Sequence, residues 1–118
     1  MTKVLSVDLE PTRLNARNLA MARVGYQVDA ANTREKAVAL SREHAYAAAV
    51  FGHEVPVDLR NTLAVNLKAA NLKVKIIMLY QGSIGNAEMA DALLSVGDPD
   101  RILDALALLL PEQRRAAS

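Results

Sequence analysis

Short apolar runs alternate with longer amphipathic segments along the chain. The runs KVLSVD, YQVDA, YAAAVF, VKIIMLY and LLSV are mostly apolar, which is typical of strands buried on both faces of a parallel sheet. Between most of them lie segments whose apolar residues recur at helical spacing. The alternation predicts strands and helices in turn, and therefore a parallel sheet with helices on both faces.

Signals at the segment ends place the first three helices. Pro11 suits a first helical turn. Asn32, with Glu35 three residues later, matches a capping box and predicts the start of a second helix. Asp58 is the predicted N-cap of a third helix, whose leucines share one face.

The region after VKIIMLY is poor helix material. Gly82 and Gly85 each cost roughly 1 kcal/mol relative to alanine inside a helix. We therefore expect at most two helical turns there, from Asn86 to Ala92. The last helix is expected to follow an N-cap at Asp98 and to stop at Pro111.

Composition narrows the class of protein. The 118 residues are 52% hydrophobic and 23% charged, which indicates one globular domain, placed at residues 1–111 with a polar tail over residues 112–118. The net charge of +1 and the 3% aromatic content favour neither nucleic acid nor an anionic membrane as a partner. The absence of cysteine excludes disulfides and thiolate chemistry. Without a signal-peptide pattern or a spanning apolar run, we expect a cytoplasmic protein.

Ligand sites in open parallel sheets lie at the carboxyl ends of the strands. The predicted edge collects Asp8, Glu10, Gly52, His53, Glu54, Tyr80 and Ser95. Asp8, Glu10 and Glu54 are weak candidates for holding a divalent metal ion, but their spacing is not diagnostic, so we predict no metal. No cofactor is predicted, because the sequence has no phosphate-cradling glycine loop.

From residue 3 to about residue 110, the chain resembles the receiver domain of bacterial response regulators, the CheY-like family. VLSVDLEP resembles the first strand and acidic pair of that family, and FGHEVP resembles its phosphoacceptor loop. VKIIMLY resembles the fourth strand, and SVGDPDRILDAL the segment with the lysine and last helix. The resemblance implies a doubly wound (βα)5 α/β fold, flavodoxin-like, with strand order 2-1-3-4-5, here with a shortened fourth helix.

The resemblance fails at the reactive positions. Receivers use an acidic pair and an acceptor aspartate around magnesium, with a hydroxyl and a lysine on the phosphoryl group. In this chain Asp8 remains, but Leu9, Gly52, Tyr80 and Ser95 replace the other four groups. Because glycine has no side chain to phosphorylate, the resemblance implies a degenerate pseudo-receiver that is not an enzyme. We expect the Tyr80 ring to fill the vacated phosphate pocket.

Apolar residues cover more than one face of the predicted last helix. Leu106, Leu109 and Leu110 are the predicted interface residues, although a shifted fourth helix could also bury some of this surface. We therefore expect a phosphorylation-independent signalling module of two-component type that binds a protein partner or a second copy through this helix. The alternative is a small-molecule or metal sensor that uses the crevice at the carboxyl ends of the strands.

Overall fold

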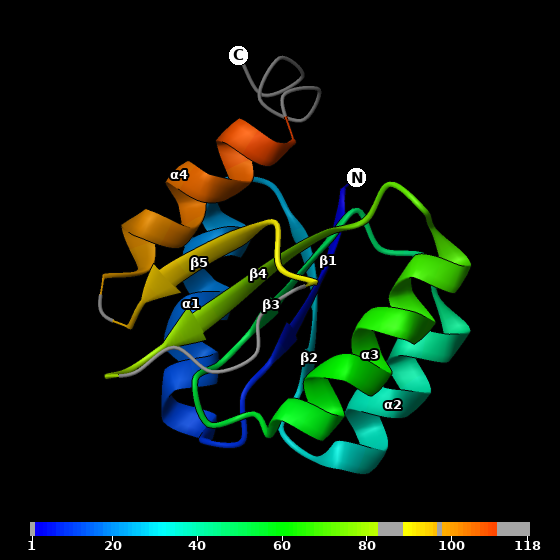
Figure 1. Ribbon diagram of the computed structural model, residues 1–118. Coiled ribbons are helices and arrows are strands. Elements are labelled where there is room, and N and C mark those ends of the chain that lie inside the picture. The colour runs from blue at the N-terminus through cyan, green and yellow to red at the C-terminus, as the bar shows by residue number, and fades with distance from the viewer. Residues whose placement is uncertain (1, 83–88, 97, 111–118) are drawn as a thin grey trace.

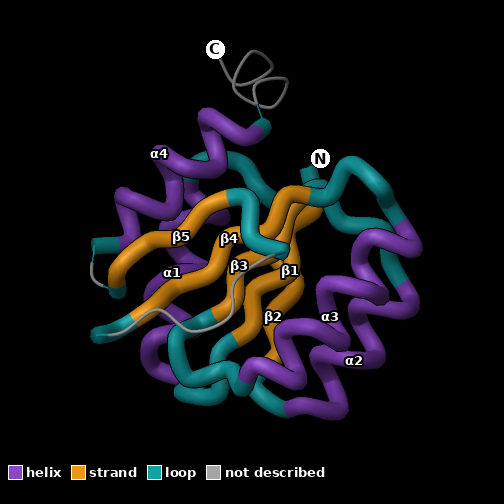
Figure 2. The backbone as a smooth tube through the Cα atoms, viewed as in Figure 1, coloured by secondary structure: helices purple, strands orange, loops and turns teal. Residues whose placement is uncertain are grey.

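The computed structural model describes residues 2–82, 89–96 and 98–110. In these residues, five strands alternate with four helices, except between the last two strands (Figures 1 and 2). The strands are β1 (Lys3–Val7), β2 (Gln27–Ala31), β3 (Ala48–Phe51), β4 (Lys75–Tyr80) and β5 (Ala92–Ser95). The helices are α1 (Pro11–Arg23), α2 (Arg34–Glu43), α3 (Val57–Ala70) and α4 (Pro99–Leu109).

The strands form one parallel sheet in the order β2-β1-β3-β4-β5. Figure 1 shows α1 and α4 on one face of this sheet and α2 and α3 on the other. The register places Val7 beside Ala31 and Phe51, and Tyr80 beside Ser95. The predicted doubly wound α/β fold and its 2-1-3-4-5 strand order are therefore confirmed.

The sheet separates two hydrophobic clusters. Successive strand residues point to opposite faces, so Ala48 and Val50 of β3 belong to one cluster, and Ala49 and Phe51 to the other. All four are fully buried. This two-sided burial is the reason why the strands read as continuous apolar runs rather than as alternating ones.

Two of the predicted helix starts are wrong, one by one residue and the other by two. Thr33, rather than Asn32, caps α2, and its hydroxyl accepts a hydrogen bond from the Lys36 amide at 3.2 Å. Helix α3 begins at Val57 with Pro56 in the cap position, so Asp58 lies in the first turn. The predicted cap of α4 is confirmed, because the Asp98 carboxylate accepts from the Asp100 amide at 2.9 Å.

The chain between β4 and β5 departs from the expected short helix. Residues 86–88 of that prediction lie outside the described residues, but Met89 is in a turn and Ala92 opens β5. The Asp91 carboxylate accepts a hydrogen bond from the Ile76 amide at 2.7 Å, and the Asp91 amide donates to the Ile76 carbonyl at 2.7 Å. These two bonds hold Asp91 beside β4 in a bend that leads into β5, so the prediction of helix up to Ala92 is wrong.

One predicted interface residue of α4, Leu106, is buried in the core. Leu106 is 0% exposed and packs in the cluster between α4, α1 and the sheet, so it has no surface to offer a partner. Leu109 and Leu110 are half-buried against the same cluster. Leu108 instead is 75% exposed.

The predicted tail, residues 112–118, lies outside the described residues. Within the described parts of the chain, no helix has the length and apolarity needed to cross a membrane.

Candidate functional site

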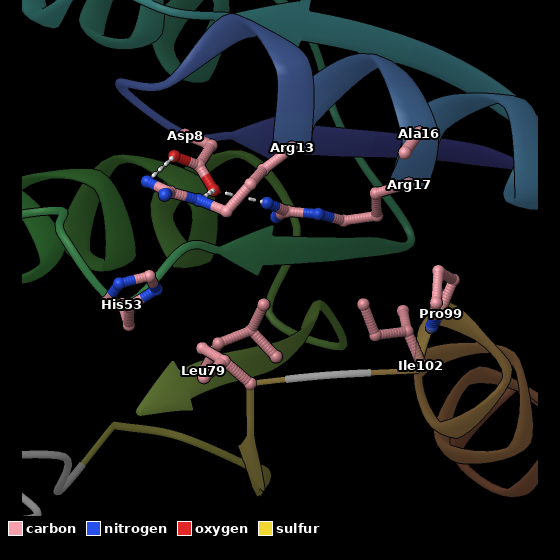
Figure 3. Close-up of a pocket in the computed structure, with 9 residues that line it drawn as sticks. Asp8, Arg13, Ala16, Arg17, His53, Leu79, Pro99 and Ile102 are labelled. Carbon is pink, nitrogen blue, oxygen red and sulfur yellow. Dashed lines mark hydrogen bonds and ion pairs between the residues drawn. The ribbon is translucent and has the colours of Figure 1, made fainter. Parts of the chain in front are cut away.

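Asp8 is the central residue of the sheet edge. It follows β1, is 1% exposed, and its amide donates to the Ala31 carbonyl at 3.2 Å. Its carboxylate accepts from Arg17 Nη2 at 2.6 Å, from the Glu10 amide at 2.9 Å and from Arg13 Nη2 at 3.2 Å. Figure 3 shows the two guanidinium groups converging on this carboxylate. A buried carboxylate is thus satisfied by two cations and a backbone donor.

Because Gly52 has no side chain, the Asp8 carboxylate can occupy the space beside it. The Gly52 amide donates to the Val7 carbonyl at 2.8 Å, which fixes the backbone of residue 52 beside the end of β1. A Cβ atom added at Gly52 would lie 2.6 Å from Asp8 Cγ and closer still to Asp8 Oδ2. Asp8 therefore fills the space where a side chain at position 52, the acceptor position predicted from the sequence resemblance, would begin.

Arg13 links the three carboxylates that were the weak metal candidates. Its Nη2 atom lies 3.2 Å from Asp8 Oδ1 and 3.0 Å from Glu54 Oε2. Its amide donates to Glu10 Oε2 at 2.8 Å, and Glu10 is the N-cap of α1. Among the described residues, no group of three or more acidic or histidine side chains is arranged to hold a metal ion. A guanidinium group therefore supplies the positive charge between these carboxylates.

Burial and ion pairing shift the pKa values of Asp8 and Arg17 in opposite directions. Burial raises the pKa of Asp8, but hydrogen bonds from the Arg13 side chain and the Glu10 amide, with the charge of Arg17, more than offset it and leave the pKa lowered. Burial lowers the pKa of Arg17, although Asp8 acts to raise it. Both groups are charged at neutral pH, since the Asp8 pKa lies below its ordinary value and arginine keeps its proton in proteins.

A cavity of about 250 Å³ lies beside the ion pairs. Figure 3 shows Asp8, Arg13 and Arg17 on one side of it, with Leu79 opposite, and with His53 and Ile102 at its two ends. Its lining residues are Asp8, Arg13, Ala16, Arg17, His53, Leu79, Val96, Pro99 and Ile102. The cavity thus lies between α1, the end of β4 and the start of α4.

The other predicted edge residues lie apart from this network. Ser95 Oγ accepts from Arg101 Nη1 at 3.0 Å, and its register partner Tyr80 is half-buried. Leu9 is 38% exposed. Neither Tyr80 nor Ser95 lines the cavity. The structure therefore brings together Asp8, Gly52, Glu10 and Glu54, and the role of Tyr80 as a filler of the phosphate pocket stays a prediction.

Sequence reasoning missed Arg13 and Arg17. A signal for Arg17 was present, because it stands three residues after Leu14 and four before Met21, both on the buried face of α1. An arginine on a buried helix face needs an anionic partner. Arg13 is four residues before Arg17 and lies on the same side of the helix.

The fold and the site can now be compared with known proteins. No protein-family model matches the sequence, and no curated protein is significantly similar to it. Solved structures do match, and they include CheY-like receiver domains and response regulators. The chain therefore has the fold of a two-component receiver domain.

Three solved structures illustrate this similarity. A CheY-like receiver domain protein from Methanospirillum hungatei is 21% identical, with a TM-score of 0.78 over 98% of both chains. The response regulator TrrA from Thermotoga maritima, solved with Mg²⁺ and BeF, is 23% identical, with a TM-score of 0.69 over 93% of this chain and 100% of the other. A complex of TrrA with the histidine kinase ThkA matches with 23% identity and a TM-score of 0.74, over 93% of this chain and 99% of the other.

Proposed function

We propose that this chain is a pseudo-receiver, a signalling module of two-component type that acts through its surface without being phosphorylated. The observation that carries the proposal is the close approach of Gly52 and Asp8. A phosphoacceptor must be a nucleophilic side chain with free space in front of it. At position 52 there is no side chain, and the neighbouring space holds the carboxylate of Asp8.

The surroundings of Asp8 also argue against the magnesium ion that phosphotransfer requires. TrrA was solved with Mg²⁺ and BeF bound. In this chain Asp8 already pairs with Arg17 at 2.6 Å and Arg13 at 3.2 Å. A divalent cation at Asp8 would be repelled by both guanidinium groups and would have to displace them. The metal-sensor alternative has the same difficulty, so we do not favour it.

A protein partner is supported by the apolar surface around α4 and β5. Leu108 is 75% exposed, although it is a large apolar side chain. Leu108 and Leu109 help to line a shallow hollow of about 420 Å³, whose charged residues are Asp91, Arg101 and Asp104. An apolar centre with a charged rim is typical of protein interfaces. Leu109 and Leu110 remain proposed contacts, and light scattering separates a homodimer from a chain that awaits a different partner.

The phosphorylation part of the proposal is tested by incubation of the chain with acetyl phosphate and Mg²⁺, followed by intact-mass measurement at neutral pH. We expect no phosphoryl adduct, because no free carboxylate stands at the acceptor position. TrrA under the same conditions is the positive control. An acid-labile adduct on Asp8 or Glu54 would refute the proposal.

A further inference from the structure

The cavity beside Arg17 contains a buried cationic donor without a partner. Arg17 is 4% exposed, and its Nη2 atom is bound to Asp8 at 2.6 Å. Its Nη1 atom is also buried, and no described residue accepts a hydrogen bond from it. His53 Nδ1 is a second buried atom of the same lining that lacks a partner among the described residues. Buried polar atoms are normally satisfied, so Arg17 Nη1 indicates a missing acceptor, and His53 Nδ1 indicates a missing partner of either kind, depending on its tautomer.

The charge and the walls of the cavity define which acceptor fits. Arg13 pairs with both Asp8 and Glu54, so the cluster of two arginines and two carboxylates is neutral. What the lining offers an anionic group is one cationic donor that has no partner among the described residues, Arg17 Nη1. Five of its nine lining residues are apolar, namely Ala16, Leu79, Val96, Pro99 and Ile102. Two parallel N–H donors of a guanidinium match the geometry of a carboxylate. The apolar walls favour a ligand whose remaining part is a hydrocarbon, rather than a ligand with a second charge or several hydroxyl groups.

The size of the cavity limits the ligand to a small molecule. Its volume of about 250 Å³ corresponds to roughly eight water molecules in the liquid, and it is below the range of drug-sized sites. Leu79 and Ile102 are 7% and 6% exposed, so this part of the apolar wall is withdrawn from water before any ligand enters. Such a pre-formed apolar space with a fixed cation is typical of a ligand site.

We propose that this cavity binds a small monocarboxylate with an apolar body, with its carboxylate on Arg17 Nη1 and its body between Leu79 and Ile102. The proposal goes beyond the pseudo-receiver function and does not depend on it. Of the degenerate phosphorylation positions, Asp8 lines the cavity, whereas Leu9, Gly52, Tyr80 and Ser95 do not. A ligand there would contact both α1 and α4, and α4 carries the proposed partner surface.

The test uses hexanoate as the probe in an amide and arginine side-chain NMR titration of the full chain. We expect saturable shifts at Arg17, Leu79 and Ile102, with a millimolar dissociation constant for so small a ligand. Hexan-1-ol, which lacks the charge, and inorganic phosphate, which lacks the apolar body, are expected to bind at least about tenfold more weakly. Equal or tighter binding of phosphate would overturn the proposal, as would the absence of saturation with hexanoate.

Two variants and one control variant locate the binding. Ala16 is exposed and lines the cavity, whereas Ala22 is exposed on the same helix and does not. Ala16→Phe is expected to weaken hexanoate binding by about tenfold or more by blocking the cavity, while Ala22→Phe leaves it within about twofold. Arg17→Lys keeps the charge beside Asp8 but removes the second donor, and a weakening of about tenfold is expected. Unchanged binding in Ala16→Phe, or shifts confined to the surface around Leu108, would contradict the proposed site.

Discussion

At the scale of single residues, Asp8 and Gly52 determine what the sheet edge can do. The carboxylate of Asp8 is buried, bound by two arginines and packed against the Cα side of Gly52. Any side chain at position 52 has to displace it. Because Asp8 is held by Arg17 at 2.6 Å and by Arg13 at 3.2 Å, this displacement breaks buried ion pairs rather than turning a free side chain.

The first prediction at this scale concerns Gly52→Ala. The added methyl group is expected to lower the free energy of unfolding by about 1–3 kcal/mol through steric overlap with Asp8. Chemical denaturation of both proteins measures this difference. In the Asp8→Ala background the methyl group meets no carboxylate, so the same substitution is expected to cost much less. Equal costs in the two backgrounds would show that the two residues are not coupled.

A second prediction follows from the lowered pKa of Asp8. Asp8→Asn is expected to reduce the free energy of unfolding at pH 7 by about 3 kcal/mol, because Arg17 loses its buried counterion. A carboxylate whose pKa is lowered by folding stabilises the native state above its unfolded pKa of about 3.9, and this contribution is lost as the pH falls through the folded pKa.

The free-energy difference between the wild-type chain and Asp8→Asn is therefore expected to shrink below pH 4. Urea denaturation of both proteins from pH 7 down to about pH 2.5 measures it. A difference that stays constant over this range would mean that the ionised state of Asp8 does not stabilise the fold.

At the scale of elements, α1 and α4 carry the features that distinguish this chain. Helix α1 presents Arg13 and Arg17 to the end of β1, and α4 closes the other side of the cavity with Pro99 and Ile102. Helix α4 also divides its leucines between two environments. Leu106 belongs to the core, whereas Leu108 is exposed to solvent.

This division predicts opposite results for two alanine substitutions in α4. Leu106→Ala is expected to lower the free energy of unfolding by about 2–5 kcal/mol, since it leaves a cavity in the core. Leu108→Ala is expected to change it by less than about 0.5 kcal/mol. Denaturation of both variants is the measurement, and a large loss with Leu108→Ala would mean that this side chain is already covered and is not a free surface for a partner.

The elements also show what the sequence could predict. The central strands β1, β3 and β4 are buried on both faces, so their apolar runs were visible without any alignment. The strand order followed from the resemblance. The starts of α2 and α3 were misplaced, because Thr33 next to Asn32 is an equally good cap and Pro56 sets the turn before α3. The ion pairs were missed because Asp8 and Arg17 belong to different elements and meet only when α1 packs on the sheet.

At the scale of the whole molecule, the receiver fold is retained while the chemistry at its edge is changed. The strand order and the placement of the helices agree with receiver domains at TM-scores of 0.69 to 0.78 in the three structures compared. In place of a metal ion between carboxylates, the edge holds Arg13 between Asp8 and Glu54. Under the proposed function, this internal cation replaces the exchangeable one that a phosphorylated receiver needs. The proposed means of recognition are then the surface around α4 and the cavity beside Arg17.

The central claim is that this edge does not bind the phosphoryl group and its magnesium ion. The most direct measurement is an amide NMR titration of the chain with Mg²⁺ and beryllofluoride, a mimic of the phosphoryl group. We predict that the amides of Asp8, Glu10, Gly52 and Tyr80 do not shift, because Asp8 remains paired with its two arginines. Saturable shifts clustered at these four residues would contradict the account.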